Sequence, residues 1–155
     1  ARPEMNAVLH THTRAGVAVT AMKTGLLPLS QHAARTLDML TYHDYEGIAL
    51  DLNERERLAK NLGKTSRAMI LRNHGLLTIG KSIAEAIEVM YYLDAACQIQ
   101  VDEMAAGLDN LIQVDSKVTQ KVFDQFETRG GYKMAMDTLQ ALTRMLDNKG
   151  VEYRV

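Results

Sequence analysis

Two histidines stand one residue apart near the start of the sequence, in the segment NAVLHTHTRAG at residues 6–16. The apolar, β-prone residues before them favour a strand, in which residues two apart project to the same face. His10 and His12 would then hold two imidazoles side by side, a geometry suited to a divalent cation such as Zn²⁺. The alternative is a pair of core or surface histidines whose ring nitrogens are satisfied by backbone groups.

A third nitrogen ligand would have to come from another segment. His74 is the best candidate, because ILRNHGLLTIG places it on a turn between two short apolar runs, with Gly75 supplying a permissive backbone. Three protein ligands and one open position are typical of a catalytic zinc site, whereas a structural site is closed by four ligands, often cysteines. The single cysteine, Cys97, lies in an apolar helical pattern, so a structural zinc cluster is not expected.

The remaining histidines are weaker candidates. His32 lies on the face of a predicted helix, and His43 is expected to bond locally to Asp44 or to solvent. The charged run NERERLAK is interpreted as the solvated face of a helix.

The elements that must position these residues follow from hydrophobic periodicity and from capping signals. Asn53 with Glu56, and Ser82 with Glu85, show the spacing of a capping box at the start of a helix. The predicted elements are a strand over 6–13, a helix ending at Gly25, a short helix capped by Ser30, a strand at 40–43, a helix from Asn53 to Gly63, a hairpin over 67–80, a long helix at about 82–106 and a C-terminal helix at about 133–148. The charged, weakly periodic stretch 107–131 is assigned no element.

Strands that alternate with helices predict a layered α/β domain, and the hairpin-length connections allow antiparallel pairing. A length of 155 residues, 46% of them hydrophobic, suits one domain. The 18 basic and 19 acidic residues are interspersed, so neither nucleic acid nor a membrane is expected as a partner. No apolar run approaches the roughly 18 residues of a membrane span, and the lone cysteine fits a reducing, cytoplasmic location.

Five motifs occur in the order NAVLHTHT, GLLPLSQHA, YHDYEGIAL, ILRNHGLLTIG and AEAIEVMYYLDAACQIQV, from about Asn6 to Gln100. With them the sequence resembles the class II aldolase/adducin family, and the tail LQALTRMLDNKG resembles the end of the adducin head domain. The resemblance implies a three-layer α/β/α domain with a mixed, mostly antiparallel central sheet. It also implies a homo-oligomer, commonly a tetramer, with active sites between subunits.

In the enzymatic members of this family, a His-x-His strand and a later histidine in a turn bind Zn²⁺. The resemblance therefore implies His10, His12 and His74 as metal ligands, with another divalent metal as an alternative to zinc. It implies an aldolase-type lyase or an epimerase that acts on a small hydroxy-carbonyl substrate, often a phosphorylated sugar, through a zinc-stabilised enediolate. The alternative is an adducin-like, non-catalytic module for oligomerisation or partner binding.

Two departures from the family pattern bear on catalysis. The family's catalytic glutamate and its phosphate-binding loops lie further upstream than this sequence extends, and Glu4 is too close to His10 to be that glutamate. Residues 1–155 are therefore expected to form one domain that lacks its N-terminal part, with open sheet edges covered by oligomer contacts or by the missing portion. Where some aldolases carry a proton-donating tyrosine, this sequence has PLSQHA, and His32 is the closest residue that could donate a proton.

Overall fold

A mixed four-stranded sheet lies at the centre of the computed structural model, which describes residues 2–47 and 53–153. Its strands are β1 (Ala7–Thr11), β2 (Leu40–His43), β3 (Ala68–Leu71) and β4 (Gly75–Gly80). They lie in the order β1-β4-β3-β2, in which β4 pairs antiparallel with both β1 and β3, while β2 and β3 are parallel. The expectation of a mixed, mostly antiparallel sheet is confirmed.

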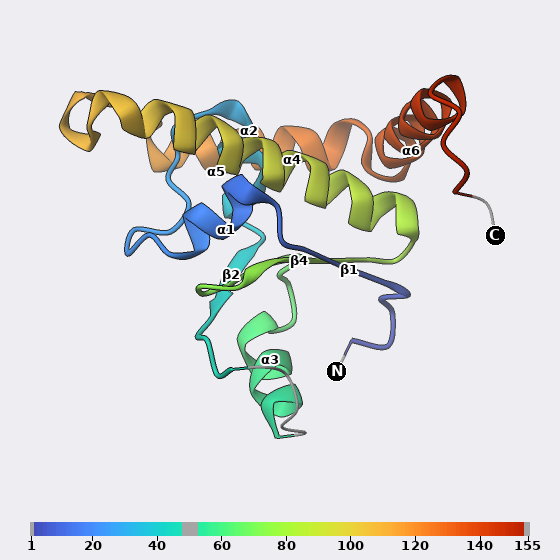
Figure 1. Ribbon diagram of the computed structural model, residues 1–155, viewed down its shortest axis with the longest axis horizontal. Coiled ribbons are helices and arrows are strands. Elements are labelled where there is room, and N and C mark those ends of the chain that lie inside the picture. Colours follow the sequence, from blue (N-terminus) through green and yellow to red (C-terminus); the bar gives the residue numbers. More distant parts are fainter. Residues whose placement is uncertain (1, 48–52, 154–155) are drawn as a thin grey trace.

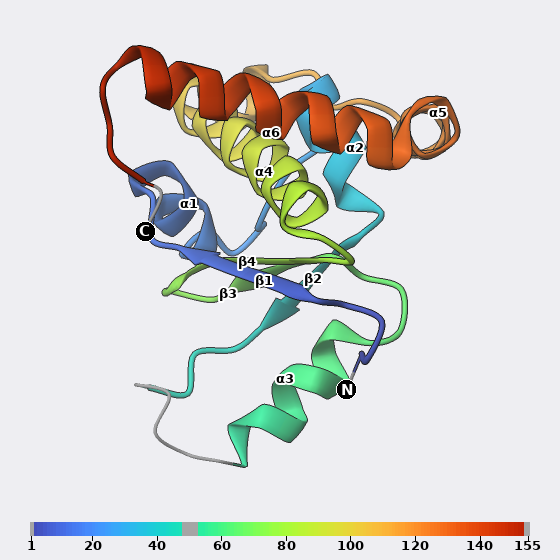
Figure 2. The ribbon, with the colours of Figure 1, turned by 90° about the vertical axis from the view of Figure 1, so that its right-hand side faces the viewer.

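Helices cover the two faces of this sheet unequally. They are α1 (Arg14–Thr20), α2 (Gln31–Leu37), α3 (Glu54–Leu62), α4 (Ile83–Glu103), α5 (Ser116–Arg129) and α6 (Gly131–Asn148), with two 3₁₀ turns, η1 (Met104–Ala106) and η2 (Leu108–Asn110). The helix α3 lies on one side of the sheet, and the other five lie on the opposite side (Figures 1 and 2). The predicted three-layer architecture is therefore confirmed, and within residues 2–47 and 53–153 one outer layer consists of α3 alone.

The hydrophobic core lies between the sheet and α4. All four residues of β3 are buried, and α4 contributes Leu93 and Cys97, both fully buried, from the helix face that lies over the sheet. Ser82 caps α4 as predicted, because its side chain accepts a hydrogen bond from the backbone N–H of Glu85 at 3.3 Å. The Glu85 carboxylate in turn accepts from the N–H of Lys81 at 2.7 Å, which fixes the start of the helix.

Several predicted boundaries change. The helix α1 ends at Thr20, before the predicted stop at Gly25, and α6 begins at Gly131, two residues earlier than expected. The stretch 107–131 contains the helix α5, which starts after Asp115 and was not predicted from the sequence. Thr119 is the one fully buried residue of α5, but Val122, Phe123 and Phe126 recur at helical spacing and are partly buried, and Phe123 packs against the core. The sequence therefore carries an apolar stripe from which this helix could have been predicted.

The helix α3 is attached differently from the others. Gly63 ends it with a φ of +66°, as the sequence predicts, but the side chain of Asn53 makes no capping bond at its start. None of its residues, all of which the structure describes, is fully buried. The sheet face on this side is correspondingly open, and Val8 of β1 is 65% exposed there. Within the described residues, no helix combines the length and apolarity needed to cross a membrane.

Candidate metal centre

His10 in β1, and His12 directly after the strand, point away from the main core. Val8 and His10 of β1 are exposed, whereas the residues between and beside them are buried or partly buried, and the hydroxyl of Thr11 donates to the sulfur of Met90 on α4 at 3.4 Å. Because neighbouring residues on a strand face opposite sides, His10 and His12 project from the sheet face on which α3 lies. Both side chains are exposed, and the predicted side-by-side placement is present.

The turn between β3 and β4 brings in the third imidazole. Asn73 adopts a left-handed φ of 55°, and the N–H of His74 donates to the carbonyl of Leu71 at 3.1 Å. The tight turn places the ring of His74 beside the rings of β1, with centroids 4.8 Å from His10 and 4.7 Å from His12. One ligand nitrogen from each of the three histidines lies within 4.8 Å of the others. The structure therefore brings together the three residues selected from the sequence.

Hydrogen bonding orients the His10 ring for ligation. Its Nδ1 lies 2.9 Å from the carbonyl oxygen of Leu76, and a carbonyl can only accept, so Nδ1 carries the proton and donates. The neutral ring then has its lone pair on Nε2, which lies 2.7 Å from Nε2 of His12. Metal-binding histidines are commonly held this way, with the second nitrogen donating to a carbonyl or carboxylate. The donor set therefore fits a divalent cation that accepts nitrogen ligands.

The absence of a side chain at Gly75 leaves room for this arrangement. A Cβ atom at this position would lie 2.5 Å from the carbonyl oxygen of Thr11, 2.7 Å from Cδ2 of His12 and 3.1 Å from Cε1 of His10. Such distances are shorter than ordinary van der Waals contact, so any larger residue would push the strand or the rings apart. The glycine after His74 is thus required for the close approach of β1 to the turn.

Burial and the neighbouring imidazoles favour the neutral form of His74. Burial lowers the pKa of His74 below the ordinary imidazole value, and the neighbouring rings of His10 and His12 lower it further, while Glu54 acts in the opposite direction. A neutral imidazole has the free lone pair that a metal needs, so a lowered pKa favours metal binding by this ring.

A cavity of about 250 Å³ adjoins two of the three histidines, His10 and His74. His43, Glu46 and Glu54 also line it. This second group was not predicted from the sequence. His43 was expected to bond locally to Asp44 or to solvent, but it is buried at the end of β2, and its Nδ1 lies 2.9 Å from the side-chain nitrogen of Asn61.

Two other candidate positions lie apart from the three histidines. His32 is on α2, across the sheet, where its ring lies 5.6 Å from that of Tyr92 on α4. Within one chain it is therefore not part of the cluster. Glu4 accepts a charged hydrogen bond from the side chain of Arg2. This bond is the main reason that the pKa of the Glu4 carboxyl lies below its usual value.

Solved structures with the same architecture define the class of protein. The chain matches an aldolase II superfamily protein from Pseudomonas syringae with a TM-score of 0.91 and 46% identity, covering 99% of this chain and 61% of that one. It also matches the L-fuculose 1-phosphate aldolase from Glaciozyma antarctica with a TM-score of 0.77 and 26% identity, covering 97% of this chain and 57% of that one. The fold is that of the class II aldolases.

The sequence comparisons establish the family. Residues 1–101 match the profile described as the class II aldolase and adducin N-terminal domain. Alpha-adducin from Rattus norvegicus is 41% identical to this chain over 97% of the chain's length. The chain therefore belongs to the class II aldolase and adducin family, as its motifs indicate. It spans 22% of the length of rat alpha-adducin and 61% of the Pseudomonas syringae protein.

Proposed function

We propose that this chain is the metal-binding part of an aldolase-type lyase, or of an epimerase, that acts on a small hydroxy-carbonyl compound such as a phosphorylated sugar. His10, His12 and His74 would hold the cation, with Zn²⁺ as the first candidate. The observation that carries the proposal is the convergence of these three imidazoles from two separate elements. The likeness to an L-fuculose 1-phosphate aldolase supports the same substrate class.

The cation would supply Lewis-acid stabilisation of the negative charge that develops when a bond next to a carbonyl breaks. The chain's own residues prepare its site. The Leu76 carbonyl holds the proton of His10 on Nδ1, and Gly75 allows β1 and the turn to meet. The cavity of about 250 Å³ beside the rings offers room for a small substrate.

An oligomer is part of this proposal. In one chain His32 lies across the sheet from the three histidines, so the proton-donor role that we infer for it would require a neighbouring copy. A homo-oligomer, a tetramer by analogy with the family, would meet that requirement and would cover the exposed face around Val8. The lone buried cysteine supports a reducing, cytoplasmic location.

A second candidate function is an adducin-like module that assembles or binds partners without turnover. The observation in its favour is the 41% identity to rat alpha-adducin over nearly the whole chain. The two candidates differ in their need for a metal, because a scaffold gains no assembly function from three convergent imidazoles.

Zinc binding by the purified protein tests the metal site. We expect His12→Ala to weaken zinc binding at least about tenfold, because it removes one of three nitrogen ligands. His32→Ala is the matched control, since it removes an imidazole that lies outside the cluster. Equal zinc affinity in the two variants would rule out the three-histidine site.

Cleavage of a panel of phosphorylated hydroxy-carbonyl compounds by the intact parent protein then separates the two candidates. Turnover that a chelator abolishes supports the lyase. Zinc binding without turnover of any member of the panel supports the adducin-like module.

A further inference from the structure

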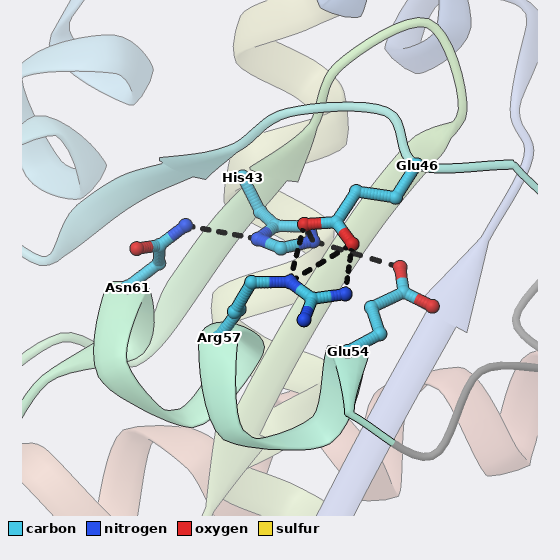
Figure 3. A network of polar contacts seen from close by, with 5 residues as sticks. All are labelled: His43, Glu46, Glu54, Arg57 and Asn61. Atoms are coloured by element: carbon cyan, nitrogen blue, oxygen red, sulfur yellow. Dashed lines mark hydrogen bonds and ion pairs between the residues drawn. The ribbon is translucent and has the colours of Figure 1, made fainter.

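We infer that His43, Glu46 and Glu54 form a second divalent-cation site, in the same cavity that His10 and His74 line. This site is separate from the one proposed above and does not depend on the aldolase activity. One ligand atom from each of the three residues lies within 4.8 Å of the others. Figure 3 shows the imidazole and both carboxylates directed toward one another.

The buried state of His43 points to a missing ligand. The residue is 4% exposed, and its Nε2 has no hydrogen-bond partner among the residues that the structure describes. A buried polar atom left without a partner costs about 1–3 kcal/mol, so native structures seldom keep one without a reason. Here the unpaired nitrogen faces two carboxylates, which is the position that a cation would occupy.

The distances fit a shared ion better than direct hydrogen bonds. Nε2 of His43 lies 3.5 Å from an oxygen of Glu54 and 3.8 Å from an oxygen of Glu46. Both distances exceed the roughly 2.7–3.2 Å of a good hydrogen bond. Two ligands bound about 2.1 Å from one ion at a tetrahedral angle are separated by about 3.4 Å. These two separations, with ligand atoms of all three side chains within 4.8 Å of one another, are compatible with an ion bound between them.

Asn61 controls which nitrogen of His43 is available. Its side-chain nitrogen lies 2.9 Å from Nδ1, an arrangement in which the amide donates and the imidazole proton sits on Nε2. A half-turn of the amide would present its oxygen instead, so that Nδ1 carries the proton and Nε2 has the free lone pair. Cation binding is therefore expected to rotate Asn61, and the amide would hold the ring in the binding orientation.

The positively charged guanidinium of Arg57 lies next to this site and should weaken the binding of a cation. It contacts both oxygens of Glu46, with its Nε at 2.8 and 2.9 Å (Figure 3). Carboxylate oxygens can accept from more than one direction, so Glu46 could bind Arg57 and an ion together, but the two positive charges repel. Removing the charge of Arg57 should therefore strengthen cation binding.

The donor set indicates the kind of ion. One imidazole nitrogen and two carboxylate oxygens suit a transition cation such as Zn²⁺ or Mn²⁺. Ca²⁺ and Mg²⁺ prefer oxygen ligands alone, so they fit this site less well. Two carboxylates against one arginine also leave a net negative charge, which favours a divalent cation.

Zinc titration of the whole protein by calorimetry, with zinc per chain measured by mass spectrometry, tests the inference. We expect wild type to bind two equivalents and Glu54→Gln to weaken the second at least about tenfold. Glu56→Gln is the matched control, because it removes the same charge from an exposed position on the same helix. Arg57→Gln should tighten the second equivalent.

The result separates this inference from the proposed function. His12→Ala should weaken mainly the first equivalent, and Glu54→Gln mainly the second, with a smaller effect on the first because the charge of Glu54 also acts on His74. A wild-type protein that binds a single equivalent, or a Glu54→Gln variant that binds zinc like Glu56→Gln, would overturn the second site. If Glu54→Gln unfolds, Glu46→Gln provides the same comparison, and thermal unfolding identifies which variants are folded.

Discussion

At the scale of single residues, Gly75 sets how closely β1 and the following turn can approach. We expect Gly75→Ala to cost about 1–3 kcal/mol of folding free energy, because its Cβ would overlap the Thr11 carbonyl and the His12 ring. The displaced rings should also bind zinc less tightly. Urea unfolding and zinc titration of the same variant check the two effects. A folded Gly75→Ala protein with unchanged zinc affinity would contradict the close packing described here.

Cys97 gives a prediction for the pH dependence of stability. Burial, helped by the nearby charge of Asp94, raises the pKa of the Cys97 thiol to about 12. In the unfolded chain the thiol loses its proton near pH 9, so the unfolded state binds fewer protons at higher pH and is favoured. The free energy of unfolding should therefore fall by up to about 1.4 kcal/mol per pH unit above pH 9.

Other groups also titrate in this range, so the informative quantity is the difference between wild type and Cys97→Ala. That difference should be constant below pH 9 and should shrink above it. Urea unfolding at intervals from pH 7 to pH 10.5 measures it. A difference that does not change with pH would mean that the thiol is not held protonated by the fold.

The three histidines could be predicted from the sequence because each depends on local geometry. A strand puts His10 and His12 on one face, and a glycine-containing turn exposes His74. The His43 group could not be predicted in this way. His43 ends a strand, Glu46 lies in the loop after it, and Glu54 belongs to a helix whose charged run was interpreted as a solvated face. The packing of α3 beside β2 brings these three residues together.

At the scale of elements, Gln100 ties the loop before α2 to the long helix α4. The side chain is 1% exposed, accepts from the backbone N–H of Leu27 at 2.7 Å and donates to the carbonyl of Gly25 at 2.9 Å. We expect Gln100→Ala to lower the free energy of unfolding by about 2–4 kcal/mol, because two backbone groups lose their partner.

Gln98 provides the control for this prediction. It lies on the same helix, but it is exposed, and among the residues that the structure describes its side chain donates to Asp94, one turn earlier, at 2.7 Å. Its replacement by alanine should cost less than about 0.5 kcal/mol. Chemical unfolding of both variants makes the comparison, and similar losses at the two positions would show that Gln100 does not link the loop to the helix.

Elements with strong local signals were predictable, and those held by tertiary contacts were not. The start of α4 is encoded by Ser82 and Glu85, and the short strand at 40–43 matches β2. In α5 the partly buried Val122, Phe123 and Phe126 form an apolar face, but the many charged and polar residues between them weaken this signal in the sequence. The contacts of α5 with α2, which the sequence alone does not show, indicate where it belongs.

At the scale of the whole molecule, a cation bound by β1 and the β3–β4 turn should stabilise the folded state. The unfolded chain does not hold the three imidazoles together, so zinc binds mainly to the folded form. Free zinc at 100 times its dissociation constant should raise the free energy of unfolding by about 2.7 kcal/mol, and a chelator should reverse the effect. Urea unfolding with and without zinc measures this shift.

The variant His12→Ala should lose most of the zinc-dependent shift, whereas His32→Ala should keep it. If zinc raised the stability of both variants equally, the stabilisation would have to arise away from the three histidines. The comparison thus tests whether the cluster seen in the fold is the place where zinc and folding are linked.

The helix α3 carries Glu54, Arg57 and Asn61 on the side that faces His43, yet it contributes no fully buried residue to the core (Figure 3). Its inner face can therefore change through evolution without disturbing the sheet that holds the three histidines. Relatives that share the sheet but differ along this one helix would be expected to differ in ion preference. A graft of α3 between two such relatives should transfer that preference along with the helix.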